Sequence, residues 1–197
     1  MKSLEFNNFL TGNISVTDEM ANALLSQCNK LNVAKGTWLL RQGELSKNAY
    51  YVETGLLRQY STDDKGKEHI LQFAPQNWFI SNRESEHLNK PSSYYIDAIE
   101  DSTVCVIKKD LIDNLSAKIT GFADFNLQLL HKHIASLQKR ITQLQSYPAH
   151  QRYLDFIQTY PDVLLRVPQT MVASYLGITP ESLSRIRKEL ANSHRTS

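Results

Sequence analysis

Apolar residues in the second half of the chain recur at alternating spacings of three and four positions between residues 127 and 144. This heptad spacing predicts one continuous helix, from about residue 122 to residue 146, with a narrow apolar seam. Polar residues flank the seam, which favours a second helix as its partner; packing against the chain's own domain is the alternative. The seam consists of Leu127, Leu130, Ile134, Leu137, Ile141 and Leu144. We therefore expect the chain to self-associate through this helix.

The pattern before residue 108 is different, because short runs of strand-forming residues alternate there with turn signals. The runs cover residues 36–40, 49–53, 56–61, 68–73, 94–99 and 103–107. Gly43, Gly55 and the segment 63–66 mark turns, and the last lies between two runs, which predicts a hairpin. Many short strands at this spacing indicate a closed antiparallel roll or jelly roll.

Shorter helices complete the expected elements. Thr17 is a good N-cap and acidic residues follow it, which predicts a helix from there to about Lys30. Further helices are expected over residues 108–115 and 149–160, on either side of the long seam helix.

Residues 169–190 have the pattern of two short helices joined by a tight turn. Gly177 can supply the positive φ at the corner, Thr179 is a good N-cap and Pro180 suits the first helical position. The inward-facing positions are Val172, Ala173 and Leu176 in the first helix and Leu183, Ile186 and Leu190 in the second. Glu181, Arg185 and Lys188 then lie on the opposite, polar side, as a DNA recognition helix requires. An ordinary helical hairpin is the alternative interpretation.

Charge adds to this picture through its distribution and not through its total, which is only +2. Residues 1–130 carry 13 Lys and Arg against 16 Asp and Glu, whereas residues 131–197 carry 9 against 4. The basic excess therefore lies in the part that contains the two short helices, as a polyanion-binding module would have it.

Location and redox state follow from what the sequence lacks. No apolar run reaches the roughly 20 residues needed to span a bilayer, and the N-terminus has no signal-peptide core. Cys28 and Cys105 are far apart in sequence and form no Cys-x-x-Cys pair, which argues against a disulfide framework or an iron–sulfur cluster. We expect a cytoplasmic protein with two thiols and no contact with a membrane.

Enzymatic chemistry has little support in the sequence. The roll contains His69 and His87 but no His-x-His pair, so we expect neither a metal site nor another cofactor. A cupin-like metalloenzyme is the less favoured alternative for the roll, and nothing selects either histidine as a haem ligand. The nucleotide-binding and nucleophile motifs of common enzymes do not occur, and we expect no enzymatic activity.

The order of elements, together with the motif Ala173…Gly177-Ile-Thr-Pro-Glu-Ser-Leu-Ser-Arg185, resembles the Crp/Fnr family of dimeric bacterial transcription regulators. Gly36, Gly43 and Gly55 lie near places where that family has turn glycines, and the segment from Arg166 onward looks like the variant found in the Bacteroidetes. The resemblance implies an α+β fold. It implies an N-terminal antiparallel β-roll of the cyclic-nucleotide-binding type (a double-stranded β-helix or jelly roll) over residues 1–115, a dimerisation helix over 116–146 and a helical, winged helix-turn-helix domain over 147–197.

The resemblance also implies an effector pocket, with one departure. Family members that bind cyclic AMP use a glutamate for the ribose and an arginine for the phosphate, and this chain has Ser81 and Ser92 at those places. Lys90 or Arg83 is the candidate substitute as a phosphate partner, but a point charge is not a bidentate fork. We therefore expect an effector other than cyclic AMP, or none. The candidate pocket residues are Trp78, Phe79, Ser81, Asn82, Arg83, Ser92, Ser93 and Tyr94.

For the recognition helix, Glu181 and Arg185 match family base-reading positions, while Pro180 replaces the arginine that often precedes that glutamate. Arg185 would contact guanine and Glu181 would accept from cytosine. The other expected DNA contacts are Gln169, Thr170, Thr179, Ser182 and Lys188. The implied partners are double-stranded DNA, a second copy of the chain, an unknown small-molecule effector and RNA polymerase. The alternative is a small-molecule-binding or protein-interaction roll with vestigial DNA binding.

Overall fold

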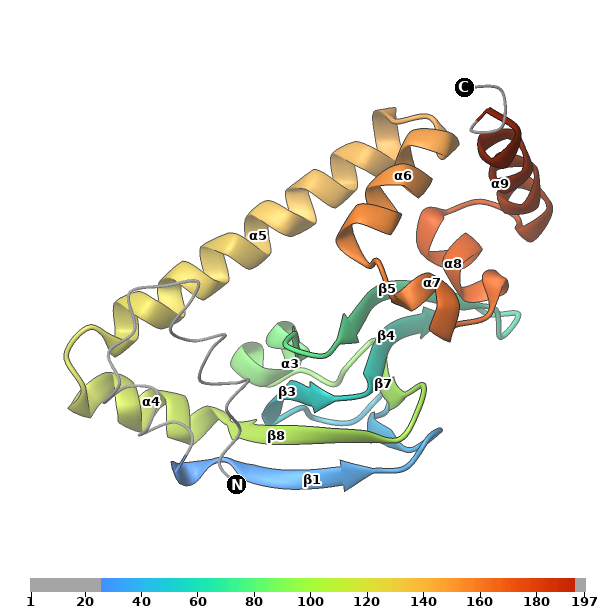
Figure 1. The fold of residues 1–197 in the computed structure, drawn as a ribbon. Coiled ribbons are helices and arrows are strands. Elements are labelled where there is room, and N and C mark those ends of the chain that lie inside the picture. Colours follow the sequence, from blue (N-terminus) through green and yellow to red (C-terminus); the bar gives the residue numbers. More distant parts are fainter. Residues whose placement is uncertain (1–25, 194–197) are drawn as a thin grey trace.

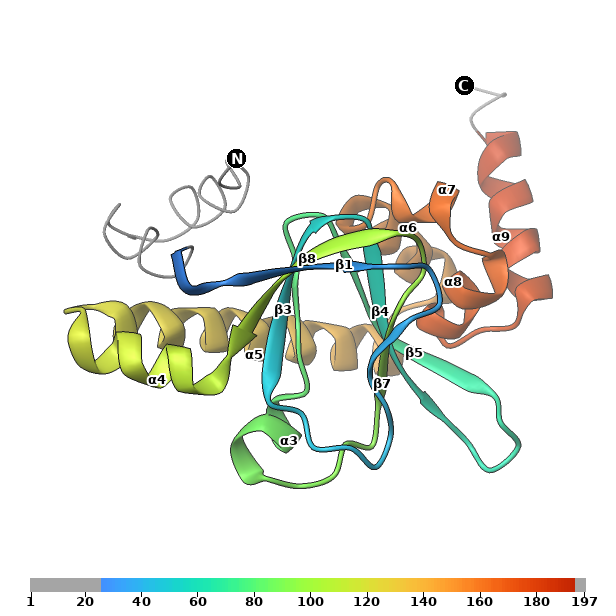
Figure 2. The same ribbon diagram turned by 90° about the horizontal axis from the view of Figure 1, so that it is seen from below.

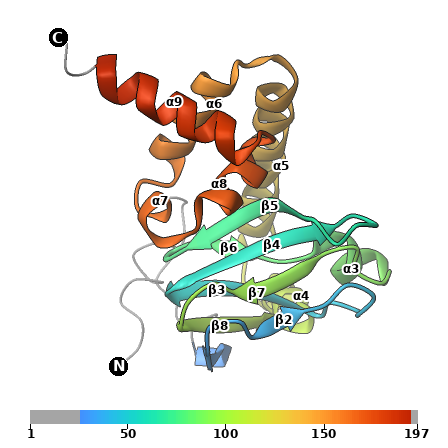
Figure 3. The ribbon, with the colours of Figure 1, turned by 90° about the vertical axis from the view of Figure 1, so that its right-hand side faces the viewer.

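The computed structural model describes residues 26–193, in which an antiparallel roll carries a long helix and a group of short helices. The roll has two four-stranded sheets, ordered β1-β8-β3-β6 and β2-β7-β4-β5, and every strand pair is antiparallel (Figure 3). The strands are β1 (Asn29–Val33), β2 (Trp38–Leu40), β3 (Asn48–Thr54), β4 (Leu56–Thr62), β5 (Glu68–Pro75), β6 (Phe79–Ile80), β7 (Tyr95–Ala98) and β8 (Ser102–Lys108). The expected jelly roll is confirmed.

All six expected strands are present, and the segment 63–66 turns the β4–β5 hairpin as expected. Two strands were missed. β6 is only two residues long, and β1 occupies a place where a helix was expected to continue. That helix was expected over residues 17–30; residues 17–25 lie outside the described residues, and the expectation is wrong at Asn29 and Lys30, which pair with β8.

The helices follow the sequence pattern closely (Figure 1). The long helix α5 spans Phe122–Ser146, as the seam predicted. The others are α3 (Arg83–Leu88), α4 (Lys109–Lys118), α6 (Ala149–Thr159), α7 (Val163–Arg166), α8 (Gln169–Leu176) and α9 (Pro180–Ser193). Residues 147–193 contain no strand, so the described part of this segment has no wing. No helix within residues 26–193 has the length and apolar character needed to cross a membrane.

Three apolar clusters hold these elements together. One fills the roll between its sheets, with Val52, Leu57 and Ile96 fully buried. The second lies between the β1-β8-β3-β6 sheet and the corner where α4 meets α5 (Figure 2). Phe122 and Phe125 pack there with Tyr51 and Cys105. The third is shared by the roll and the C-terminal helices.

The third cluster joins the C-terminal helices to the outer face of the β2-β7-β4-β5 sheet. Phe73 of β5 contacts the rings of Phe156, Tyr160 and Tyr175, whose centres lie 5.6–6.2 Å away. At the sheet edge, the Ser174 hydroxyl of α8 accepts from the Ile70 amide (3.0 Å) and donates to the Glu68 carbonyl (2.9 Å). Because these contacts form one core, α6–α9 and the roll are packed as one body.

Candidate nucleic-acid interface

The two helices α8 and α9 are fixed by a buried stripe and a glycine corner. Val172, Ala173 and Leu176 of α8 and Leu183 of α9 are at most 1% exposed. Gly177 adopts the left-handed conformation (φ +66°), and its amide donates to the carbonyls of Ala173 and Ser174, which ends α8. A side chain with a Cβ would be strained at this torsion, so the glycine permits the tight corner.

The outward face of α9 carries the expected base-reading groups. Glu181, Arg185 and Lys188 are all exposed, opposite the buried Leu183 and Ile186. The Glu181 side chain hydrogen-bonds to its own backbone amide and to Thr179, and these bonds lower the pKa of its carboxyl. Glu181 therefore stays ionised at neutral pH and can accept hydrogen bonds from a base edge.

The remaining expected DNA contacts surround the starts of both helices. Gln169 and Thr170 are exposed in the first turn of α8, and Thr179 caps α9 by accepting from the Ser182 amide (3.2 Å). The Ser182 hydroxyl accepts from Thr179 (3.2 Å) and is half-buried. Helix N-termini offer free amides to phosphates, so each of the two helix starts is suited to contact with a polyanion.

The seam of α5 is open to solvent in the single chain. Leu127, Ile134, Leu137, Ile141 and Leu144 are 42–54% exposed, whereas Leu130 is half-buried. The neighbouring Leu129 turns inward and packs against the cluster at the α4–α5 corner. A row of half-exposed leucine and isoleucine along one helix face is an apolar surface without a partner in its own chain.

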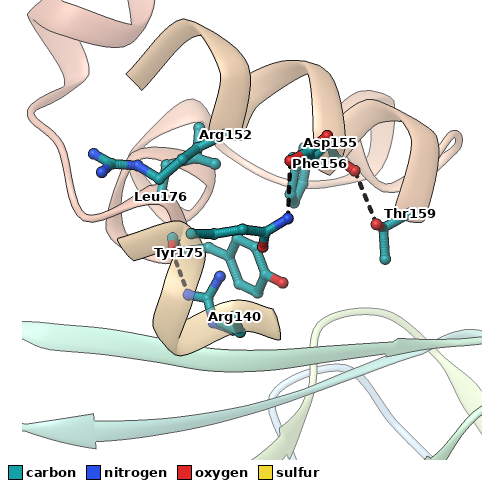
Figure 4. A pocket seen from close by; sticks show the side chains of 8 residues that line it. Arg140, Arg152, Asp155, Phe156, Thr159, Tyr175 and Leu176 are labelled. Carbon is teal, nitrogen blue, oxygen red and sulfur yellow. Dashed lines mark hydrogen bonds between the residues drawn. The ribbon is translucent and has the colours of Figure 1, made fainter. Parts of the chain in front are cut away.

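The C-terminal end of α5 lies against α6 and α8, and residues of these three helices line a pocket (Figure 4). The Arg140 guanidinium lies 3.5 Å from the centre of the Tyr175 ring and donates to the Tyr175 carbonyl. Gln143 donates to Asp155 of α6 (2.8 Å). These contacts join the C-terminal end of α5 to α6 and α8.

The expected effector pocket is only partly assembled. Asn82 and Ser92 are both buried and hydrogen-bonded to each other (2.6 Å), and the Ser92 hydroxyl donates to the Tyr94 carbonyl (2.8 Å). Asn82 also caps α3 through the Ser85 amide (3.2 Å). Ser92, at the position of the phosphate-binding arginine, therefore has its hydroxyl already bonded within the protein.

The other expected pocket residues lie in different surroundings. Trp78 packs against Tyr160 in the cluster shared with the C-terminal helices, and Phe79 packs against Tyr51 at the opposite sheet (5.1 Å in both cases). The Ser81 carbonyl accepts from Gln59 (3.4 Å), Arg83 begins α3, and Ser93 is exposed. The structure thus brings together Asn82, Ser92 and Tyr94. It places Trp78 and Phe79 in two different clusters.

Sequence reasoning missed two charged contacts that support this arrangement. Arg58 is buried on the outer face of its sheet, where it donates to Asp97 (2.8 and 3.0 Å) and to Glu68. Burial lowers the pKa of Arg58, but its bonds to Asp97 and Glu68 raise it more, and the group stays charged. Arg166, which leads into α8, donates to Glu100 and to the Gly55 carbonyl (2.8 Å). Arg58–Asp97 and Arg166–Glu100 join residues that are far apart in sequence, so no local spacing could indicate these contacts.

Comparison with known proteins agrees with this architecture. Residues 30–118 match the family described as "Cyclic nucleotide-binding domain". The chain is similar to the fumarate and nitrate reduction regulatory protein of Yersinia pestis, with 26% identity over 168 residues. The match covers 80% of this chain and 66% of that relative, slightly less than two thirds of its length.

Solved structures show the same fold. The structure of FixK2 from Bradyrhizobium japonicum matches with a TM-score of 0.74 at 18% identity and covers 85% of this chain and 86% of that one. The catabolite activator protein of Thermus thermophilus matches with a TM-score of 0.58 at 19% identity, over 91% of this chain and 86% of that one. The chain therefore contains a cyclic-nucleotide-binding-type roll over residues 30–118 and shares its order of roll, long helix and C-terminal helices with these regulators of the Crp/Fnr type.

Proposed function

We propose that this chain is a non-enzymatic transcription regulator that binds double-stranded DNA as a homodimer in the cytoplasm. The observation that carries the proposal is the exposed polar face of α9, with Glu181, Arg185 and Lys188 opposite a fully packed apolar face. The names of its relatives, among them a fumarate and nitrate reduction regulatory protein and an anaerobic regulatory protein, support the same function.

Base reading is assigned to two side chains. Arg185 carries a guanidinium whose paired donors match the O6 and N7 acceptors of guanine in the major groove, and Glu181 is an ionised acceptor for the N4 amine of cytosine. Gln169, Thr170, Ser182 and Lys188 position the phosphates, with Thr179 holding the start of α9.

The exposed seam of α5 supports the dimer. Two copies packed along Leu127–Leu144 bury apolar side chains that one copy leaves half-exposed. Binding to two half-sites requires the recognition helices to lie about 34 Å apart, which is one turn of duplex. We propose that the roll, over about residues 1–115, and the seam helix set this spacing, that a small molecule other than cyclic AMP or no effector acts on the roll, and that RNA polymerase is a further partner.

The test uses a cognate duplex selected from a random pool by the full-length protein. Arg185→Ala should weaken binding to that duplex by about 1–3 kcal/mol, roughly 5- to 150-fold, and relax selectivity at one base pair per half-site. Lys188→Ala is the matched control on the same face; it should weaken all duplexes equally and lower the salt slope by about one.

Fluorescence anisotropy with cognate and scrambled duplexes at several salt concentrations measures both effects. If Arg185→Ala binds both duplexes as the unaltered protein does, α9 does not read DNA. The roll would then be the functional part of the chain, as a small-molecule-binding or protein-interaction domain.

A further inference from the structure

Both cysteines of the chain lie on one face of the β1-β8-β3-β6 sheet, although 77 positions separate them in sequence. β1 pairs with β8 so that Lys30 lies opposite Cys105. Side chains alternate along a strand, and Cys28, just before β1, therefore lies on the same side as Lys30 and Cys105. This is the face that α4 and the start of α5 cover.

The two thiols are neighbours in the same cluster, and a carboxylate and a cation lie beside them. Cys105 Sγ lies 3.1 Å from Oε1 of the buried Glu53, and Lys30 Nζ lies 2.6 Å from Oε2 of the same group. Cys105 is 1% exposed and Cys28 is half-buried. The Cys28 thiol is therefore within reach of solvent, whereas the Cys105 thiol is buried beside Glu53, which can accept a proton.

We propose that Cys28 and Cys105 form an oxidisable dithiol that peroxide converts to an intramolecular disulfide. This site is independent of the DNA-binding function proposed above.

The reaction has two balanced steps. The Cys28 thiolate attacks hydrogen peroxide, the O–O bond breaks, and Cys28 becomes a sulfenic acid while the leaving hydroxide takes up a proton to form water. Cys105 sulfur then attacks the Cys28 sulfur, its proton passes to Glu53, and the hydroxyl of the sulfenic acid leaves as water once it is protonated. In total, two thiols and one peroxide give one disulfide and two waters, and a dithiol reductant reverses the change.

The assignment of the attacking and resolving cysteine follows from their surroundings. Cys28 is half-buried and open to peroxide, whereas Cys105 is 1% exposed and donates its proton to Glu53 (3.1 Å). The contact with Cys28, burial and the Glu53 carboxylate together raise the pKa of Cys105. A thiolate is the nucleophile in thiol oxidation, so the half-buried Cys28 reacts first. Cys105 stays protonated until its proton can pass to Glu53.

The experiment treats the reduced full-length protein with one equivalent of hydrogen peroxide and counts thiols after denaturation. Because the chain has only 2 cysteines, the expected result is a fall from two free thiols to none and a mass loss equal to two hydrogens. A Cys28–Cys105 cross-linked peptide should appear, at a rate independent of protein concentration, and dithiothreitol should restore both thiols. Cross-links between chains, or oxidation that stops at one cysteine, would overturn the proposal.

Two sets of variants assign the roles. In Cys105→Ala the Cys28 sulfenic acid should persist and be trapped by dimedone, whereas Cys28→Ser should leave Cys105 unreacted at the same peroxide concentration. Glu53→Gln should slow disulfide closure at least about tenfold and let the sulfenic acid accumulate, because the proton acceptor is removed. Reaction of Cys105 in Cys28→Ser reverses the assigned order, and closure of Glu53→Gln at the unaltered rate removes Glu53 from the mechanism.

Discussion

At the scale of single residues, Gly43 and Gly55 have similar left-handed torsions (φ +87° and +95°) but different surroundings. A Cβ on Gly43 would meet nothing within 4 Å, whereas one on Gly55 would lie 2.2 Å from Ser102 Oγ and 2.6 Å from Ser102 Cα. Gly43→Ala should therefore cost only the torsional strain, about 1–2 kcal/mol, which is a fall in Tm of roughly 2–8 °C.

Gly55→Ala should cost clearly more, because Ser102 Oγ accepts from the Leu56 amide (3.2 Å) and the strands must separate to make room. Thermal unfolding followed by circular dichroism compares the two variants directly. Equal losses of Tm in the two variants would show that the protein accommodates the Cβ at position 55 beside Ser102 without loss of stability.

The buried pair Asn82–Ser92 leads to a prediction about ligands. A cyclic phosphate that leaves water needs a charged, hydrogen-bonding partner, but Ser92 is neutral and already bonds to Asn82 (2.6 Å), and Ser81 offers the ribose no carboxylate. Two missing charged hydrogen bonds, at about 1.5–3 kcal/mol each, weaken affinity at least about a hundredfold. Isothermal titration with cyclic AMP should therefore give no binding in the micromolar range, and a micromolar isotherm would refute this.

Local chemistry was predictable where it depends on neighbours in sequence. Gly177 at the corner and Thr179 as the N-cap of α9 were both predicted, because turn and cap chemistry is set within a few residues. The contact between Cys28 and Cys105 was missed, because it arises from the β1–β8 register and not from any spacing along the chain.

At the scale of elements, the seam of α5 makes the dimer testable. Leu137→Asp would place a carboxylate in the apolar interface twice per dimer, at roughly 2–7 kcal/mol for each unpaired polar group. We expect a folded monomer whose affinity for a two-half-site operator falls at least about a hundredfold, because the second recognition helix no longer adds to binding. Light scattering and a gel shift measure the two effects.

Ala135→Asp is the matched control, since Ala135 is also exposed on α5 but lies off the seam. It should remain dimeric and bind the operator normally. A dimeric Leu137→Asp would locate the interface elsewhere, and a monomeric Leu137→Asp that retains full affinity would separate dimerisation from operator binding.

The elements with a strong repeating pattern were predicted almost to the residue, and the weakly patterned ones were not. The seam indicated α5 itself, and Tyr147-Pro148, shortly after the last seam residue Leu144, indicated where the helix ends. β1 has mostly exposed side chains and β6 has only two residues, so neither shows the alternation by which strands are recognised.

At the scale of the whole molecule, the roll and the C-terminal helices share the aromatic cluster around Phe73. We expect Phe73→Ala to cost about 3–5 kcal/mol and to loosen α6–α9 from the sheet, because this ring contacts Phe156, Tyr160 and Tyr175. Loosening frees Arg166 from Glu100 and Gly55, so trypsin should cut after Arg166 faster than in the unaltered protein.

Phe79→Ala is the control, since Phe79 packs against Tyr51 away from this interface. It should lower the free energy of unfolding without speeding cleavage at Arg166, which time-resolved proteolysis with mass spectrometry can follow. Equal cleavage in both variants would mean that general instability, and not undocking, exposes the site.

This shared core limits how the proposed dimer can move. The helix α9 lies at the opposite end of the molecule from α4, and α5 runs between these two ends (Figure 1). The roll and α6–α9 share one core, and α5 contacts α6 and α8 at its C-terminal end. Because the roll and α6–α9 share one core, they rotate about the seam as one body. Each part of that body is displaced in proportion to its distance from the seam. A small change of angle along α5 then becomes a large sideways shift of α9, so the geometry works as a lever with its pivot on the leucine seam.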